Sequence, residues 1–567
     1  MFSKLFLLPK SILLSLFFQD LGHVLADTTP YFNDQRFENG DYGSYPVQKF
    51  FSSNVVAPHL NILTKHSRCD DGSYIMFNPR GNAVAEDARG PMILDSLGNL
   101  VWVVTGYEQT YNLMAQEYKG QQYLTFWSGN DAVGGHGAGH YYMLDSTYKE
   151  VARISAASGM EGDLHEFRFT EDGTALITVY DVHPADLTAL GGPQDGYIWD
   201  SLFQEIDIET GNLIFQWRAS EHYNLTDSYH SSDGRGSRND PWDFFHINSV
   251  EKDPWGNYLV SARYVHTITY INGTTGSVIW VLGGQRNEFT DLSEGRATDF
   301  AYQHDARWHD NYTVISIFNN GAQAPGQKEN AQFSRAMKIA IDTKDRTATL
   351  VSQYINSQQI LSSSQGSMQI LPNGDVLVGY GYDAAFTEFA PNGVVLCDTH
   401  FGAASRFESG DVQSYRVMKF NWTGHPTTKP SMAIVDDVAY VSWNGATEVH
   451  QWVIDTGEFS DGDDDAWRPV ISATKVGFET RIELSKNLGS YIRVAAVDRE
   501  GKVIGASDAF KYEQTRIFDN LQLSGSDTRP LMFLICFAIF TSLSMGIGWV
   551  IHVKRRTWGY SPISVKV

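Results

Sequence analysis

The segment from Trp242 to Gly284 contains four short stretches that are rich in apolar, aromatic and β-branched residues. Turn sequences separate them, notably Asp253-Pro-Trp-Gly-Asn257 and Asn272-Gly-Thr-Thr-Gly276. Asp, Asn, Pro and Gly favour tight turns, whereas β-branched and aromatic residues favour strands. The segment therefore predicts four consecutive strands, which is the outline of one β-propeller blade.

Similar segments recur at about the 40-to-50-residue period that is typical of propeller blades. The six segments span residues 70–102, 122–154, 165–217, 242–284, 303–354 and 368–402. One such unit cannot bury both faces of its sheet alone, so successive units stack in a closed ring. The chain also has 42% hydrophobic residues, 13% aromatic residues and 50 glycines, which suits many short strands joined by tight turns. We therefore expect an all-β protein with a six-bladed β-propeller over residues 70–402.

The repeat is flanked by segments of different character. Residues 27–69 are predicted to be an N-terminal leader, and residues 403–433 a connector. From 434 to 511, alternating apolar and polar residues are separated by acidic and glycine-rich turns, which is typical of an immunoglobulin-like or fibronectin-like β-sandwich. Residues 512–530 are predicted to be a polar stalk.

Both ends of the chain carry membrane-targeting signals. Residues 1–26 have two lysines, a short apolar core and a small residue at Ala26, which predicts a secretory signal peptide; an uncleaved anchor is the alternative. Residues 531–553 are apolar enough for one C-terminal transmembrane helix, and Lys554-Arg-Arg556 follows at once. The positive-inside rule then places the tail, 554–567, in the cytosol. We expect a single-pass type I protein of the secretory pathway or plasma membrane, with most of the chain lumenal or extracellular.

Glycosylation and disulfide formation are both consistent with that topology. Four Asn-x-Thr sequences mark candidate glycosylation sites at Asn224, Asn272, Asn311 and Asn421. Of the three cysteines, Cys536 lies in the predicted span, which leaves Cys69 and Cys397 on the lumenal side. Cys69 directly precedes the first blade and Cys397 lies in the last, and ring closure makes these two blades neighbours. A disulfide between them would join those blades, and two buried free thiols are the alternative.

Three consecutive blades place a histidine just before or within their first strand: His165, His246 and His304. The innermost strands of a propeller converge on its axis, so equivalent positions of successive blades face one another. Arg263 lies in the same blade as His246, and so does Asn248. These side chains are therefore expected to meet in one pocket at the channel.

Such a cluster suits group transfer from an oxyanion ester. Neutral imidazole can act as a nucleophile or move a proton near neutral pH, and the planar guanidinium of arginine suits sulfate or phosphate oxygens. Three histidines could instead bind a metal, but we expect none, because His-x-His and His-Glu-x-x-His motifs are absent and Arg263 would repel a cation. The glycine-rich segment His136-Gly-Ala-Gly-His140 is predicted to be a flexible loop.

The formal net charge of −23 argues against a nucleic-acid partner, because phosphate contacts need a basic face. It also means that an anionic substrate must be held by a local group of positive charges.

Several motifs together resemble the arylsulfotransferase family, in its fungal branch. They are Asp163-Leu-His-Glu-Phe167, Trp242-Asp-x-Phe-His-Ile-Asn-Ser-Val250, Gly256-Asn-Tyr-Leu-x-Ser-x-Arg263, Thr275-Gly-x-x-Ile-Trp-x-Leu-Gly-Gly284 and Gln303-His-Asp-Ala-Arg307. The resemblance covers residues 70 to 402 and leaves out the predicted sandwich and membrane anchor.

The resemblance implies an enzyme that moves a sulfuryl group between phenolic compounds through a sulfated histidine, without a nucleotide sulfate donor. His304 would be the nucleophile, His246 and Arg263 would hold the sulfate oxygens with help from Asn248, and His165 would donate a proton or bind oxygen. We expect phenols or aryl sulfates as small-molecule partners and no cofactor.

Two other functions remain compatible with the sequence. A non-catalytic propeller ectodomain that binds a ligand or partner would suit the anchor and the glycosylation sites. A quinoprotein dehydrogenase would suit the Thr-Gly turns that precede Trp217 and Trp280.

Overall fold

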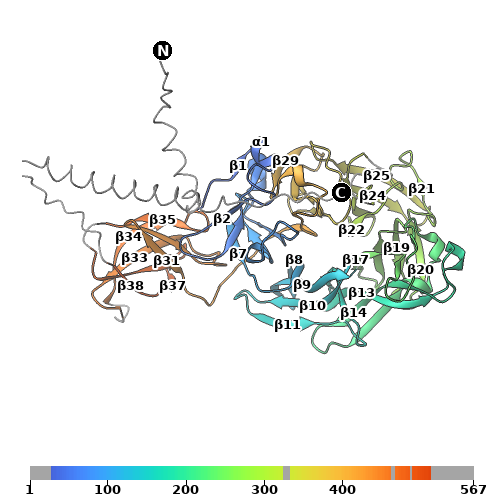
Figure 1. The fold of residues 1–567 in the computed structure, drawn as a ribbon, viewed down its shortest axis with the longest axis horizontal. Helices are drawn as coiled ribbons and strands as arrows, with labels where there is room; N and C mark the ends of the chain where they lie inside the picture. The colour runs from blue at the N-terminus through green and yellow to red at the C-terminus, as the bar shows by residue number, and fades with distance from the viewer. Residues whose placement is uncertain (1–26, 134, 324–331, 461–465, 486–487, 513–567) are drawn as a thin grey trace, which may run out of the picture. The chain divides into compact units, whose positions relative to one another are not determined.

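A computed structural model describes residues 27–133, 135–323, 332–460, 466–485 and 488–512. These residues form an all-β protein, as predicted (Figure 1). Its α-helix, α1 (Gln35–Glu38), is a single turn capped by Asp34, whose carboxylate accepts hydrogen bonds from two backbone N–H groups.

Six antiparallel units of four strands make up most of the described residues. The first consists of β5 (Tyr74–Phe77), β6 (Met92–Leu94), β7 (Leu100–Val103) and β30 (Val417–Phe420). The second consists of β8 (Gln109–Tyr118), β9 (Gln121–Val133), β10 (His136–Leu144) and β11 (Glu150–Ile154). The third consists of β12 (Gly162–Phe169), β13 (Thr174–Ala185), β14 (Gly196–Asp207) and β15 (Leu213–Arg218).

The remaining three units follow in chain order. The fourth consists of β17 (Ile247–Lys252), β18 (Tyr258–Ala262), β19 (Thr267–Ile271) and β20 (Val278–Leu282). The fifth consists of β22 (His304–His309), β23 (Val314–Asn319), β24 (Arg335–Asp342) and β25 (Thr347–Tyr354). The sixth consists of β26 (Ser367–Ile370), β27 (Val376–Gly379), β28 (Ala385–Phe389) and β29 (Val395–His400).

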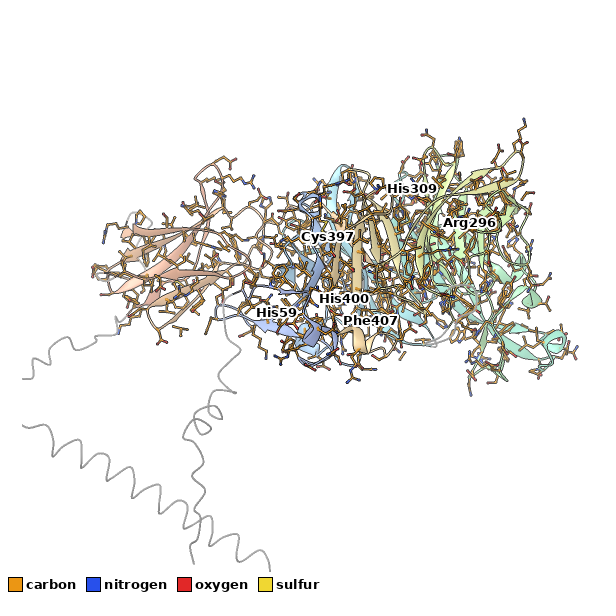
Figure 2. The ribbon with its side chains drawn as sticks, turned by 90° about the horizontal axis from the view of Figure 1, so that it is seen from above. His59, Arg296, His309, Cys397, His400 and Phe407 are labelled. Carbon is orange, nitrogen blue, oxygen red and sulfur yellow. A yellow bond between two sulfur atoms is a disulfide. The ribbon has the colours of Figure 1, made fainter. Side chains whose placement is uncertain are left out.

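The units close into a propeller-like ring. Each inner strand contacts the inner strand of the next unit, in the cycle β8, β12, β17, β22, β26, β30 and back to β8. A hydrophobic cluster lies between each pair of neighbouring units; the one between the third and fourth includes Phe203, Trp217 and Val260. Figure 2 shows how densely side chains fill the space between the sheets. Middle strands such as β18 are accordingly buried at every residue, on both faces of the sheet.

Glycines lie in the hairpin turns, at the positions that the sequence predicted. In the fourth unit, the Asp253 carboxylate accepts hydrogen bonds from the N–H groups of Trp255 and Asn257, each at 2.9 Å. Gly256 completes this turn with φ +83°, a conformation that other residues rarely adopt. The indole N–H of Trp217 donates to the carbonyl of Gly276 in the next unit, at 3.1 Å. This hydrogen bond joins the third unit to the Thr-Gly turn of the fourth.

The ring is closed by a strand from the segment predicted to be a connector. β30 lies within residues 403–433 and pairs antiparallel with β5, so the first unit combines both ends of the repeat. The predicted leader, 27–69, also contributes strands. β4 (Asn61–Thr64) extends the sixth unit beside β29, and β1 (Tyr31–Phe32) pairs with β4, while β2 (Val47–Lys49) pairs with β3 (Val56–Pro58). The short β16 (Trp242–Asp243) and β21 (Thr290–Asp291) run parallel to β14 and β25.

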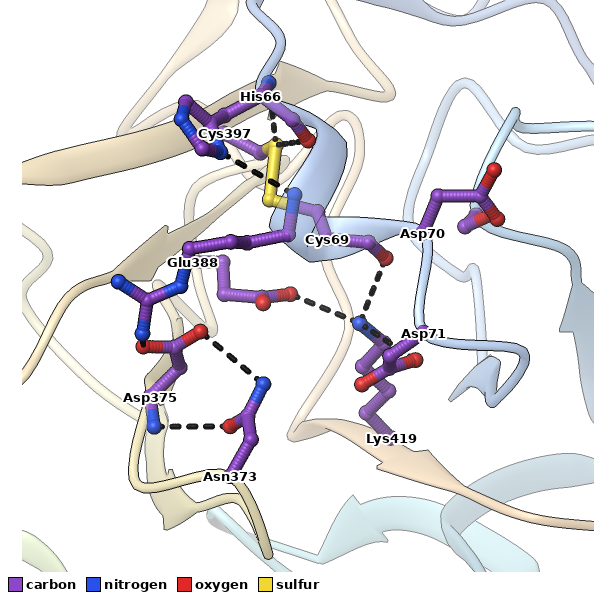
Figure 3. Close-up of a disulfide and its surroundings, with 11 residues drawn as sticks. His66, Cys69, Asp70, Asp71, Asn373, Asp375, Glu388, Cys397 and Lys419 are labelled. Atoms are coloured by element: carbon purple, nitrogen blue, oxygen red, sulfur yellow. Dashed lines mark hydrogen bonds and ion pairs between the residues drawn. A yellow bond between two sulfur atoms is a disulfide. The ribbon is translucent and has the colours of Figure 1, made fainter.

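Cys69 and Cys397 form a disulfide, so the predicted bond is confirmed (Figure 3). Cys69 lies just before β5, and Cys397 lies on β29. The bond therefore joins the first unit to the sixth.

Two antiparallel sheets follow the ring. One contains β31 (Ser431–Val435), β32 (Val438–Ser442) and β35 (Thr480–Glu483). The other contains β33 (Gln451–Gly457), β34 (Arg468–Thr474), β36 (Tyr491–Val497), β37 (Val503–Ala506) and β38 (Phe510–Lys511). One hydrophobic cluster, which includes Val441, Trp452 and Ile492, draws on both. The assignment of residues 434–511 to an immunoglobulin-like or fibronectin-like sandwich stays a prediction.

The predicted signal peptide (1–26), transmembrane helix (531–553) and cytosolic tail (554–567) lie outside the described residues, as does the stalk apart from Tyr512. Within the described part of the chain, no helix is long and apolar enough to cross a membrane. Asn224, Asn311 and Asn421 are exposed and Asn272 is half-buried. Their glycosylation stays a prediction.

Candidate active site

The three histidines predicted to converge lie at the inner strands of consecutive units. His165 is on β12, His246 directly precedes β17 and His304 begins β22. Each inner strand loses regular register with its neighbour at this point. His246 has φ +56°, and Asp305, beside His304, has φ +57°. Bulges of this kind re-aim side chains and often occur next to active sites.

His165, His246, His304 and Arg263 all line one cavity of about 400 Å³. The imidazole rings of His165 and His246 lie edge to face, with centroids 4.9 Å apart. The backbone N–H of Arg263 donates to the carbonyl of His246 at 2.8 Å, so these two residues are held together by the main chain. The structure thus brings together the four residues that the sequence assigned to catalysis.

Each histidine has a fixed partner at its Nδ1 atom. His165 Nδ1 lies 2.7 Å from a carboxylate oxygen of Asp163, and His246 Nδ1 lies 2.5 Å from one of Asp243. His304 Nδ1 lies 2.7 Å from the side-chain oxygen of Asn320. In His165 and His246, Nε2 is therefore the nitrogen left to meet a bound molecule, whereas Nε2 of His304 accepts a hydrogen bond from the backbone N–H of Gln365 at 3.2 Å.

Burial keeps two of these imidazoles neutral. Loss of solvation lowers the pKa of His304 well below its ordinary value, and the charge of Arg263 lowers it further. Burial likewise lowers the pKa of His246, with His165 and Arg263 acting in the same direction. Burial raises the pKa of Asp243 to about 6. A neutral imidazole has a free lone pair, so His304 remains available as a nucleophile under mildly acidic conditions.

Arg263 presents a guanidinium that is held by backbone carbonyls and aromatic rings. One of its terminal nitrogens donates to the carbonyls of Gln323 and Ser363, both at 2.9 Å. Its guanidinium lies 4.9 Å and 5.3 Å from the ring centroids of Tyr264 and Tyr302. No carboxylate among the described residues forms an ion pair with it. Such a group suits a sulfate or phosphate oxygen.

Asn248 does not line the cavity, contrary to its predicted role in substrate binding. It is fully buried, and its side-chain N–H donates to the carbonyl of Gln303 at 2.7 Å. Asn248 thus ties the fourth unit to the residue that precedes His304. In a regular strand it would share a face with His246, but the bulge between Ile247 and Ser249 breaks that alternation.

The glycine-rich segment His136–His140 is also not a loop, because it belongs to β10. A side chain at Gly139 would meet the Ser128 carbonyl at 2.3 Å, so the glycines allow close packing of the strands around Trp127. His136 is buried and stacks on Tyr180.

The cavity is also lined by residues that the sequence did not predict. Arg80 of the first unit donates to the side-chain oxygens of Gln365 and Gln413, at 2.8 Å and 3.0 Å. The other unpredicted polar and aromatic lining residues include Tyr111, Tyr264, Tyr382 and Tyr415. These residues come from loops and strand ends whose sequences do not repeat from unit to unit. The tyrosine rings give the cavity surfaces on which an aromatic molecule can pack.

Charged residues next to the histidines form a buried network of ion pairs. Glu166 pairs with Arg307 at 2.6 Å and with Arg416 at 3.0 Å, and Asp305 pairs with Arg307 at 2.8 Å. Burial opposes ionisation of Glu166, but the two arginines outweigh it and lower its pKa to about 2. This network links inner strands of the third and fifth units with the segment before β30.

No group of three or more His, Cys, Asp or Glu side chains in the described part of the chain is arranged to hold a metal ion.

A family model described as Arylsulfotransferase (ASST) matches residues 114–402, about half of the chain. A search of curated proteins finds no match.

Solved structures with a similar arrangement of strands have low sequence identity. A protein of unknown function from Bacteroides caccae is 11% identical, with 62% of this chain and 100% of that chain covered and a TM-score of 0.36. The periplasmic gluconolactonase PpgL of Pseudomonas aeruginosa is 10% identical, with 77% and 96% covered and a TM-score of 0.32. The β-propeller domain of Cps50 (Swd1) from Myceliophteria thermophila is 11% identical, with 73% and 99% covered and a TM-score of 0.28.

All three histidines and Arg263 fall within the matched residues, whereas Arg80, Gln413 and Tyr415 lie outside them. By this match, the chain belongs to the arylsulfotransferase family.

Proposed function

We propose that this protein transfers a sulfuryl group from an aryl sulfate to a phenol through a sulfated His304. The observation that carries the proposal is the convergence of His165, His246, His304 and Arg263 on one cavity. Family membership supports sulfotransferase activity in general, and the arrangement of these side chains supports the specific reaction.

In the first half-reaction, the lone pair of His304 Nε2 forms a bond to sulfur while the bond between sulfur and the aryl oxygen breaks. The electron pair of the broken bond goes to the phenol oxygen, which takes a proton from His165. Arg263 holds the sulfuryl oxygens, on which negative charge is concentrated in the transition state, and His246 joins it when its Nε2 carries a hydrogen. An acceptor phenol then repeats these steps in reverse and regenerates free His304.

The rest of the cavity supports an aromatic substrate. Its tyrosine rings supply packing surfaces for the aryl group. The positive charge of Arg263 offsets the repulsion that a chain of net charge −23 exerts on an anionic sulfate ester.

The test is sulfate transfer from a chromogenic aryl sulfate to a phenol by the purified full-length protein. We expect His304→Ala to abolish both release of the chromophore and the sulfated histidine that mass spectrometry detects in the wild type. His140→Ala removes an exposed imidazole on β10 that does not line the cavity, so it should leave turnover unchanged.

Failure of the wild type to turn over any donor in a panel, with no sulfated histidine, would contradict the proposed reaction. Binding of phenyl sulfate without turnover would then favour the alternative, a ligand-binding propeller ectodomain.

We also propose that the protein is a single-pass type I glycoprotein with its ring in an oxidising compartment. The apolar stretch 531–553, the following basic residues and the accessible Asn-x-Thr sites support this topology. The disulfide supports it too, because such bonds persist mainly in the secretory pathway and outside the cell. Glycosidase treatment should reduce the apparent mass of the expressed protein. Protease added outside sealed microsomes should digest the tail and leave the ring intact.

A further inference from the structure

The three histidines of the cavity differ in the partner that holds Nδ1. Asp163 and Asp243 supply carboxylates to His165 and His246. His304, the proposed nucleophile, has instead the amide of Asn320, which directly follows β23. A carboxylate favours the protonated, cationic imidazole, whereas an amide oxygen favours it far less.

Two carbonyl groups fix the orientation of the Asn320 amide. Its side-chain nitrogen donates to the carbonyls of Ser362 and Gln365, both at 2.9 Å. Since carbonyls only accept hydrogen bonds, the nitrogen must face them and the oxygen must face His304. Asn320 is fully buried, so solvent offers no alternative partner.

The orientation of Asn320 determines where the hydrogen of neutral His304 lies. Because the amide oxygen only accepts, His304 Nδ1 must carry the hydrogen. Nε2 is then an acceptor, and the backbone N–H of Gln365 donates to it at 3.2 Å. Asn320 therefore contacts His304 directly and also holds the peptide that contacts the opposite ring nitrogen.

We propose that Asn320 is the positioning residue that makes His304 the nucleophile, by holding it as the neutral tautomer with hydrogen on Nδ1 and the lone pair on Nε2. This inference rests on the proposed sulfuryl transfer. It also assigns a role to the Gln365 N–H, which donates to Nε2 in the free enzyme and to a sulfuryl oxygen once Nε2 has bonded to sulfur.

The chemistry of the intermediate explains why an amide suits this position better than a carboxylate. When Nε2 forms its bond to sulfur, Nδ1 keeps its hydrogen and the ring becomes cationic. A cationic ring is a good leaving group for the second half-reaction, in which the bond between nitrogen and sulfur breaks and the ring recovers the electron pair. A carboxylate would stabilise the cationic ring, or remove its proton, and either effect slows that step.

Other charged and titratable groups lie near His304. Arg263 follows β18, His165 lies on β12, His246 precedes β17, Tyr415 precedes β30, and Asp305 is on β22 itself. Arg263, His165 and His246 all oppose protonation of His304, as burial does. The hydrogen bond of Asn320 acts in the opposite direction.

Asn320→Asp tests the inference in the full-length protein. An added carboxylate beside an imidazole raises its pKa by about 1–3 units. We therefore expect the acidic limb of kcat/KM to move to higher pH by about that amount, and sulfated His304 to accumulate during turnover. Asn320→Ala removes the orienting oxygen, and we expect kcat/KM to fall by roughly 100-fold.

A second measurement does not depend on activity. In ¹⁵N-histidine-labelled protein, signals absent from His304→Ala identify His304. We expect the wild type to show hydrogen on Nδ1, Asn320→Ala to show a mixture of tautomers, and Asn320→Asp to protonate His304 at higher pH. Asn356→Ala is the matched control, since that buried amide also bridges two groups but lies outside the cavity; it should leave the His304 signals unchanged.

The outcomes separate the two proposals. The role of Asn320 would be overturned if wild-type His304 carried its hydrogen on Nε2, or if Asn320→Asp left the protonation of His304 unaltered. Either result would count even if sulfuryl transfer occurs. If the expected tautomer and shift appear without sulfuryl transfer in the wild type, the positioning contact is supported and the proposed function fails.

Discussion

At the scale of single residues, the buried Asp383 and the half-buried Glu408 lie behind the carbonyl that accepts from Arg263. The Ser363 carbonyl accepts from Arg263, and the Ser363 N–H donates to Glu408 at 2.9 Å. The Glu408 N–H in turn donates to Asp383 at 2.7 Å. Burial raises the pKa of Asp383 well above its usual value, and the nearby Glu408 carboxylate raises it further.

This shift predicts a pH-dependent stability. Because the folded state binds the Asp383 proton more tightly than the unfolded state, the resulting stability is present below about pH 4 and is lost as pH rises. Asp383→Asn keeps an acceptor for Glu408 but cannot ionise. Thermal melts should show a higher Tm than wild type at about pH 8, with a difference that shrinks toward about pH 4. Asp87 is exposed, so Asp87→Asn should show no such gain in Tm. An equal gain at both pH values for Asp383→Asn would contradict the raised pKa of Asp383.

The sequence revealed the histidines of the site but not the residues that orient them. His165, His246 and His304 could be predicted because they recur at one point of a repeated unit. Asn320 and Gln365 could not, because they lie in connections between strands, whose sequences do not repeat. Asn248 was assigned to the pocket because it lies in the same blade as His246, but the bulge beside His246 breaks the alternation that would place both on one face.

At the scale of secondary-structure elements, the strands of the repeat follow from the sequence, but the strand that closes the ring does not. The four residues of β30 lie in a segment without the repeat pattern, and only pairing with β5 identifies them as the inner strand of the first unit. The partner of such a strand is distant in the chain, so local patterning carries little information about it.

A buried lysine on β30 gives a test of this closure. Lys419 pairs with Glu388 of β28 at 3.0 Å and donates to the Cys69 carbonyl at 2.8 Å (Figure 3). Removing one member of a buried pair leaves an uncompensated charge, so Lys419→Met should lower the unfolding free energy by about 3–5 kcal/mol in urea titrations. Adding Glu388→Gln should recover part of that loss. The exposed pair of Lys429 and Asp508 is the control, and Lys429→Met should cost at most about 1 kcal/mol. A similar small cost for Lys419→Met would show that the pair does not stabilise the closure.

At the scale of the whole molecule, ring closure combines the pairing of β30 with β5, the Lys419 ion pair and the disulfide. The strand pairing and the disulfide join the beginning of the repeat to its end, and Lys419 contacts both Glu388 of the sixth unit and the Cys69 carbonyl. A closed ring predicted that the first and last units are adjacent, and their adjacency predicted the disulfide. It did not show that the two ends share one sheet.

The disulfide predicts a global effect on stability without an effect on the site. It connects residues 328 positions apart, so its loss frees a long loop in the unfolded state and should lower the unfolding free energy by about 2–5 kcal/mol. Neither cysteine lines the cavity of His304, so Cys69→Ser with Cys397→Ser should retain the wild-type affinity for phenyl sulfate below its lowered Tm. Reductant should lower the Tm of the wild type toward that of the double variant and leave the variant unchanged. Weaker binding in a variant that is still folded would instead show that the bond between the first and sixth units also shapes the cavity.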